Sequence, residues 1–157
     1  VREFTLERIQ HGDNNRFGIW ATVVEMIKAN PMVGVGPGVH PIVYNKYLVE
    51  GAMPNAGHAH NIVLGAFADL GIFGGIPMMW IMFVIAVSSL RLVLSAPIET
   101  DRGLGAALIG VFVHQLFDMA IYGAQIGSLF WILGGLACIR AEGMQRSVQS
   151  EARAVSS

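Results

Sequence analysis

The sequence predicts an all-α, polytopic membrane protein, and three observations support this fold class. Hydrophobic residues make up 54% of the 157-residue chain and charged residues only 13%, which is too apolar for a soluble domain of this size. The longest apolar runs follow residue 61, whereas residues 1–61 are more polar and rich in turn-forming residues. We therefore expect about three transmembrane helices, preceded by a large extracytoplasmic loop that holds short helices.

Composition also excludes some classes of function. The formal net charge is -1, so the chain has no basic field with which to hold nucleic acid through its phosphates. Cys138 is the single cysteine and can form no intrachain disulfide, which favours a packing role. Residues 1–10 lack the pattern of a signal peptide. If residues 1–61 lie outside the cytoplasm, an upstream segment must take them there, so we expect a fragment of a longer protein.

One helix is expected inside the loop. Asn14 or Asn15 can cap a helix over about residues 16–29. Asn30-Pro31 predicts its end, because proline disfavours helical geometry in the residue before it. Four apolar residues of this helix recur at three- and four-residue spacing: Phe17, Trp20, Val24 and Ile27.

Residues 62–94 form a nearly continuous apolar stretch, which exceeds the roughly 20 residues of one transmembrane helix. We expect a short interfacial helix at residues 62–70, a break or kink in the glycine-rich segment 71–75, and a transmembrane helix over about residues 76–94. Pro77 would then lie in the first turn of that helix, where proline is tolerated.

The later apolar runs are shorter. A polar hairpin at residues 95–103 separates the first transmembrane helix from a second, over about residues 104–122. A third is expected over about residues 124–139. The polar tail that follows is expected to be disordered beyond its first turns.

The predicted organisation has four parts. Residues 1–61 are the loop with the candidate motifs, residues 62–75 the interfacial helix and kink, residues 76–140 the transmembrane helices, and residues 141–157 a cytoplasmic tail. Arginine residues flank the hairpin and follow the last helix, whereas the tip around Gly123 has none. Because loops rich in arginine stay in the cytoplasm, we expect the hairpin and the tail on the cytoplasmic face and residues 1–61 on the opposite face. The arginine residues that flank the hairpin or follow the last helix are Arg91, Arg102, Arg140, Arg146 and Arg153.

Residues 58–74 place two histidines at the water-facing start of a membrane helix, and three interpretations compete. The first is structural, with Asn61 or His60 capping the helix. The second is a metal site at His58 and His60, but no further ligand cluster lies nearby in the sequence and Asp69 is most of a short helix away. We therefore expect no metal and no cofactor. The third is catalytic, because a histidine of ordinary pKa can accept a proton from an attacking hydroxyl.

The same segment resembles a known signature. His60-Asn61, nine further residues and then Gly71-x-x-Gly74 resemble the H-N/S/Q-x9-G-x-x-G pattern of O-antigen ligases. The match holds position by position.

A second match lies upstream, in the expected order and at the expected spacing. Arg16-x-x-x-Trp20 and the segment NPMVGVGPG at residues 30–38 resemble the R-x-x-x-W and N-P-L-x-G-V-G-P-G stretch of the wider O-antigen ligase and polymerase family. The later helices, including HQLFD at residues 114–118, resemble the last transmembrane helices of the family more loosely.

The resemblance implies a glycosyltransferase of bacterial cell-envelope and lipopolysaccharide biosynthesis. Such an enzyme transfers a glycan, without a metal, from an undecaprenyl diphosphate carrier to an acceptor hydroxyl on a lipid A core sugar or on a growing repeat-unit chain. It is a multi-pass protein of the inner membrane, surrounded by membrane lipids, with its active loop on the periplasmic face. Family members have around a dozen transmembrane helices, so the fragment alone need not be active.

The family motif assigns roles to individual residues. His60 would be the general base toward the acceptor hydroxyl, and Asn61 would orient it or cap the helix. Arg16 would stabilise the departing diphosphate through its guanidinium, although it can also be a solvated residue at a helix start. We include His58 and Trp20 among the residues that position substrate.

The glycines and the later polar pair have structural interpretations. Residues 34–38 lack the G-K-S/T of a phosphate loop, so Gly36 and Gly38 are expected to form a rigid turn, with backbone N–H groups near the diphosphate as an additional role. Gly71 and Gly74 are expected at kinks or close-packing positions. His114 and Asp118, four residues apart, would share one helix face and fix helix packing or line a groove for the carrier lipid.

Two alternatives to the enzyme remain at the level of sequence. The first is a non-catalytic membrane subunit or docking fragment of a polysaccharide assembly system, in which the histidines are helix caps. The second is a fragment of a metal-binding transporter, which would need more intramembrane ligands than His114 and Asp118. The paired motifs favour the enzyme, without separating ligase from polymerase.

Overall fold

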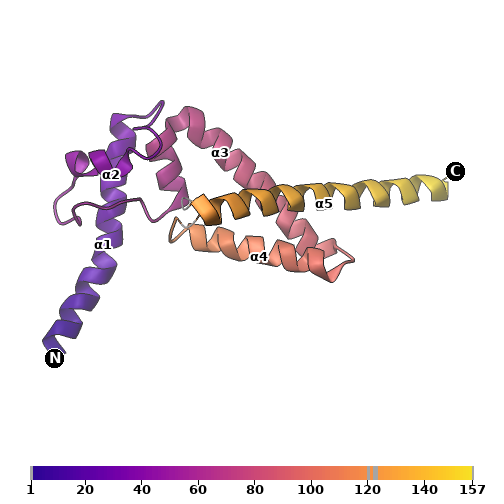
Figure 1. Cartoon of the computed structure of the whole chain (residues 1–157), viewed down its shortest axis with the longest axis horizontal. Coiled ribbons are helices and arrows are strands. Elements are labelled where there is room, and N and C mark those ends of the chain that lie inside the picture. Colours follow the sequence, from indigo (N-terminus) through magenta and orange to yellow (C-terminus); the bar gives the residue numbers. More distant parts are fainter. Residues whose placement is uncertain (1, 120, 122–123, 157) are drawn as a thin grey trace. The chain divides into compact units, whose positions relative to one another are not determined.

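The computed structural model describes residues 2–119, 121 and 124–156, with side chains for residues 16–119, 121 and 125–154. Helices account for the regular structure of these residues, in which no strand occurs. Figure 1 shows them in chain order: α1 (Arg2–Ala29), α2 (His40–Val43), the 3₁₀ helix η1 (Tyr44–Tyr47), α3 (Ile62–Ser95), α4 (Glu99–Gln115) and α5 (Ala124–Ser156).

The chain divides into two compact units. Unit 1 consists of Val1–Met79 and Leu116–Met119, and unit 2 of Trp80–Gln115 and Ala120–Ser157. Unit 1 contains α1, α2, η1 and the first part of α3, and unit 2 contains the rest of α3 together with α4 and α5.

Helix α1 ends at Ala29, immediately before Asn30-Pro31, as predicted. It begins at Arg2, so Asn14 and Asn15 lie inside the helix, and the prediction that one of them caps it is wrong. The helix is therefore long, where the sequence predicted short loop helices. The buried face is also different, because Phe17 is 67% exposed. Among residues 16–29, the part of α1 whose side chains are described, the buried apolar residues are Ile19, Val23 and Met26.

Helix α3 contains the predicted break. Gly71 has φ 63° and ψ -164°, which is not helical, and the helix changes direction there (Figure 1). The second part resumes at Ile72, so Pro77 lies beyond its first turn and not within it as predicted. Proline in this position leaves one carbonyl of the preceding turn without its helical donor.

The segment at residues 31–36 fills the break by bonding to both parts of α3. Carbonyls of this segment accept hydrogen bonds from the first N–H groups of the second helical part, and N–H groups of this segment donate to the last carbonyls of the first part. Backbone groups left free by a helix break need partners of this kind. The four bonds are Ile72 N–H to Pro31 O (2.8 Å), Phe73 N–H to Met32 O (3.1 Å), Val35 N–H to Ala68 O (2.8 Å) and Gly36 N–H to Asp69 O (2.9 Å).

Two glycines make this close approach possible. A Cβ on Gly34 would lie 2.4 Å from the backbone carbon of Asp69, and a Cβ on Gly71 would lie 2.4 Å from the backbone carbon of Met32. Both glycines also have positive φ, 67° and 63° respectively, which residues with a side chain rarely adopt. Glycine is therefore required on both sides of the joint, in two motifs that are far apart in the sequence.

His40 and Asp69 form a buried polar pair next to this joint. The ring of His40 stacks on Tyr44, with centroids 5.6 Å apart, and its Nδ1 lies 3.8 Å from Oδ1 of Asp69, with both side chains 5% exposed. Burial, with a smaller contribution from the charge of His58, lowers the pKa of His40 from 6.5 to about 4.

This pKa predicts a pH-dependent stability of the loop. Between pH 6.5 and pH 4 the unfolded chain binds more protons at His40 than the folded chain, so the free energy of unfolding decreases as the pH is lowered through this window, by about 3 kcal/mol in total. His40→Phe keeps the stacked ring and removes the titration. Chemical unfolding of the full-length protein at several pH values should show a shallower pH dependence in the variant, and parallel curves would contradict the prediction.

In unit 2, α4 and α5 pack side by side (Figure 1). The predicted boundaries need correction. Helix α4 spans Glu99–Gln115, where the sequence predicted a helix over residues 104–122; Tyr122 and the tip at Gly123 lie outside the described residues. Helix α5 continues to Ser156. The tail that was predicted to be disordered beyond its first turns is therefore helical, because its alanine, glutamine, arginine and glutamate residues have good helix propensity.

Two helical segments are long and apolar enough to cross a membrane, namely Ile62–Ser95 and Gln125–Ala154. The 17-residue α4 is not among them. Within the described residues, two helical segments thus have the length and composition required of a transmembrane helix, where the sequence predicted three.

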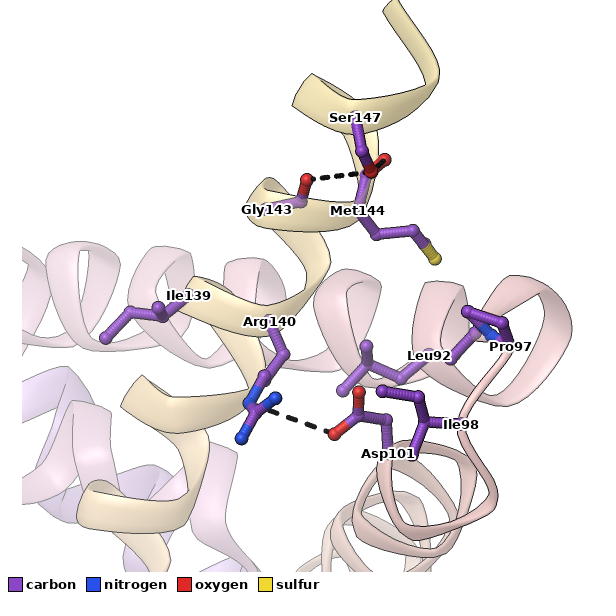
Figure 2. A pocket seen from close by; sticks show the side chains of 10 residues that line it. Leu92, Pro97, Ile98, Asp101, Ile139, Arg140, Gly143, Met144 and Ser147 are labelled. Atoms are coloured by element: carbon purple, nitrogen blue, oxygen red, sulfur yellow. Dashed lines mark hydrogen bonds and ion pairs between the residues drawn. The ribbon is translucent and has the colours of Figure 1, made fainter. Parts of the chain in front are cut away.

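A cavity of about 470 Å³ lies in unit 2, where the start of α4 meets the end of α3 and the middle of α5 (Figure 2). Its lining is mostly apolar, and its ion pair joins Asp101 of α4 to Arg140 of α5 with an N–O distance of 3.9 Å. None of the site residues predicted from the sequence lines this cavity. The chemistry predicted from the motifs therefore has to be sought in unit 1.

Candidate active site

Three side chains predicted from the sequence meet in unit 1. Oδ1 of Asp118 lies 3.2 Å from Nδ1 of His60 and 3.4 Å from Nε2 of His58. The centroids of the two imidazole rings are 4.0 Å apart. The side chains are partly exposed, by 42% for His58, 32% for His60 and 43% for Asp118, so the cluster can be reached from solvent.

The backbone between the histidines is held by α1. Nε1–H of Trp20 donates a hydrogen bond to the carbonyl of Ala59, at 3.0 Å. His60 itself has φ 50°, a left-handed conformation that is uncommon for residues with a side chain and is concentrated at functional sites. The tryptophan of the R-x-x-x-W motif therefore positions the two histidines.

Asn61 is the N-cap of α3, as one of the sequence interpretations predicted. Its Oδ1 accepts hydrogen bonds from the N–H groups of Val63 and Leu64, both at 3.0 Å. Its Nδ2 donates to the carbonyl of Leu116, also at 3.0 Å. A single side chain thus fixes the start of α3 and the backbone two residues before Asp118.

Asp118 does not occupy the position that the sequence predicted. Because α4 ends at Gln115, Asp118 lies in the non-helical segment that follows, and it does not share a helix face with His114. Its Oδ1 also accepts a hydrogen bond from the N–H of Met119, at 2.7 Å. This bond, followed by those from His60 and His58, lowers the pKa of Asp118 against the opposing effect of desolvation. The carboxylate is therefore ionised at neutral pH.

The remaining predicted residues have different environments. Arg16 is exposed and lies one helical turn before Trp20, on the same face of α1. Gly36 and Gly38 form the expected turn with positive φ, but the N–H of Gly36 already bonds to Asp69 and is not free for a diphosphate. A Cβ on Gly74 would lie 2.6 Å from Cβ of Leu70, which agrees with close packing.

The sequence motifs contact one another in pairs within unit 1. Arg16 and Trp20 share a face of α1, Trp20 holds the histidine segment, and the glycine-rich turn joins the two parts of α3. Comparison with known families also groups these motifs together, because a single family model covers all of them. Residues 7–81 match the O-antigen ligase family.

The predicted resemblance is thereby confirmed for these residues. O-antigen ligases are membrane proteins, and the two apolar helical segments of this chain agree with that assignment. Asp118 lies outside the residues that match the O-antigen ligase family, and folding of the chain brings its carboxylate next to His60. No significant match is found among the curated proteins or the solved structures.

Proposed function

We propose that this chain is the catalytic part of a membrane glycosyltransferase. The reaction is transfer of an oligo- or polysaccharide from undecaprenyl diphosphate to an acceptor hydroxyl, on a lipid A core sugar or on a growing chain, at the periplasmic face of the inner membrane. The observation that carries the proposal is the pairing of the motif histidine with a carboxylate: His60, within the residues that match the O-antigen ligase family, lies 3.2 Å from Asp118.

The pairing sets the tautomer of His60. An ionised Asp118 next to Nδ1 favours the proton on that nitrogen, which leaves Nε2 with a free lone pair. Nε2 then takes the proton of the acceptor hydroxyl as its oxygen bonds to the anomeric carbon and the bond from that carbon to the diphosphate breaks. The resulting imidazolium is stabilised by the carboxylate, as in other histidine–carboxylate pairs.

Departure of the diphosphate requires stabilisation of developing negative charge, and Arg16 supplies a permanent guanidinium. The side chain is exposed on the face of α1 that carries Trp20, so it is available to a donor bound near the histidines. A guanidinium contacts two phosphate oxygens at once, which a lysine ammonium does not.

Arg16→Lys tests this role because it preserves the charge and removes the two-point contact. We expect transfer by the full-length parent protein to decrease about tenfold. Glycan transfer from a lipid diphosphate-linked donor is the measurement. Arg153→Lys, at an exposed position near the end of α5, is the matched control and should leave transfer unchanged; equal rates in both variants would remove Arg16 from the chemistry.

A further inference from the structure

The cluster of His58, His60 and Asp118 has a second chemical capacity. Each residue offers one ligand atom, and the three atoms lie within 4.8 Å of one another. The sequence argued against a metal because no further ligand is close in the chain. The fold supplies that ligand from 58 residues away.

The spacing of the ligand atoms suits a small divalent cation. Ligands about 2.0–2.1 Å from a tetrahedral zinc ion lie roughly 3.3 Å from each other. The distances from Asp118 Oδ1 are 3.2 Å to His60 Nδ1 and 3.4 Å to His58 Nε2. An ion on Oδ1 of Asp118 can therefore replace the two hydrogen bonds, with the two imidazole nitrogens, which lie within 4.8 Å of each other, moving closer together.

The ligand types and their surroundings agree with the spacing. Two imidazole nitrogens and one carboxylate are ligands of zinc-class ions, with solvent able to take the fourth position. The bond from Trp20 to Ala59 and that from Met119 to Asp118 hold the ligands from outside the cluster, as groups behind metal ligands commonly do.

We propose that His58, His60 and Asp118 bind a zinc-class divalent cation, and that the bound ion inhibits glycan transfer. An ion on Nδ1 of His60 takes that lone pair and leaves the ring proton on Nε2, so that Nε2 can no longer accept a proton. The inhibition rests on the proposed function of His60, whereas the binding does not.

Binding is tested with Co²⁺ as a spectroscopic probe on the full-length protein in detergent. We expect one ion per chain, visible absorption typical of tetrahedral cobalt, and displacement by Zn²⁺. Asp118→Asn and His58→Ala should each weaken Co²⁺ binding at least tenfold. His114→Ala removes an exposed histidine outside the cluster and is the matched control. Thermal unfolding of each variant verifies that it is folded.

The outcomes separate the two proposals. Absence of cobalt absorption, or affinities unchanged in both cluster variants, would overturn the metal site even if His60→Ala abolishes transfer. Cobalt binding that depends on Asp118 and His58, with transfer slowed over the same range of free Zn²⁺, would support the site and the inhibition. Binding without any slowing of transfer would leave the site standing and contradict inhibition through His60.

Discussion

Replacing His60 by alanine is expected to reduce glycan transfer at least a hundredfold. The substitution removes the proposed general base, and a positioned general base contributes on the order of 10² to 10⁴ in rate. His60 is partly exposed and is not a core residue, so the loss should not come from unfolding. The measurement is transfer from a lipid diphosphate-linked donor to a core acceptor by the full-length protein, with membrane insertion verified.

The control for this substitution is His114→Ala. His114 is exposed in the last turn of α4 and lies outside the histidine–carboxylate cluster, so its replacement should leave transfer close to that of the wild type. If an inserted His60→Ala protein transfers glycan normally, His60 is not the base. The interpretation of the loop as a docking surface of a non-catalytic subunit would then be the better one.

Replacing Gly71 by alanine is expected to destabilise the protein strongly. The new Cβ would lie 2.4 Å from the backbone of Met32, and backbone cannot move aside as the end of a flexible side chain can. The backbone of Gly71, with φ 63° and ψ -164°, lies in a region essentially restricted to glycine, which adds a conformational cost of about 1–3 kcal/mol. We expect the free energy of unfolding to decrease by more than about 3 kcal/mol, measured by chemical denaturation of the full-length protein.

Gly38→Ala separates the two parts of this cost. Gly38 also has positive φ, 75°, but a Cβ there would meet no atom within 4 Å. Its replacement should therefore cost only the conformational part, about 1 kcal/mol. Gly34→Ala, on the other side of the joint, should behave like Gly71→Ala. Equal losses at Gly38 and Gly71 would show that the contact between the loop and α3 does not contribute.

The sequence predicted those features of the fold that depend on local chemistry. Asn30-Pro31 ends α1, Asn61 caps α3 and Gly71 breaks it, because the signals for a helix end, a cap and a kink are read within a few residues. The buried face of α1 was not predictable from spacing, since apolar residues occur on several of its faces and tertiary contacts select among them.

The site was only partly predictable for a related reason. His58, His60 and Asn61 are neighbours in the chain, so their proximity followed from the motif alone. The sequence predicts that Asp118 shares a helix with His114, because a four-residue spacing is what two residues on one helix face would have. Only the end of α4 at Gln115 and the hydrogen bond from Asn61 to Leu116 bring the carboxylate to the histidines, and neither has a short-range signal.

The joint at Gly71 also constrains the order in which the protein assembles. Residues 31–36 bond to N–H and carbonyl groups that become available only when α3 is already broken at Gly71. Residues 62–79 emerge from the ribosome later than this loop segment. The loop can therefore dock only after the first part of α3 has been synthesised and has formed. Completion of the loop is thus coupled to formation of the helix that follows it.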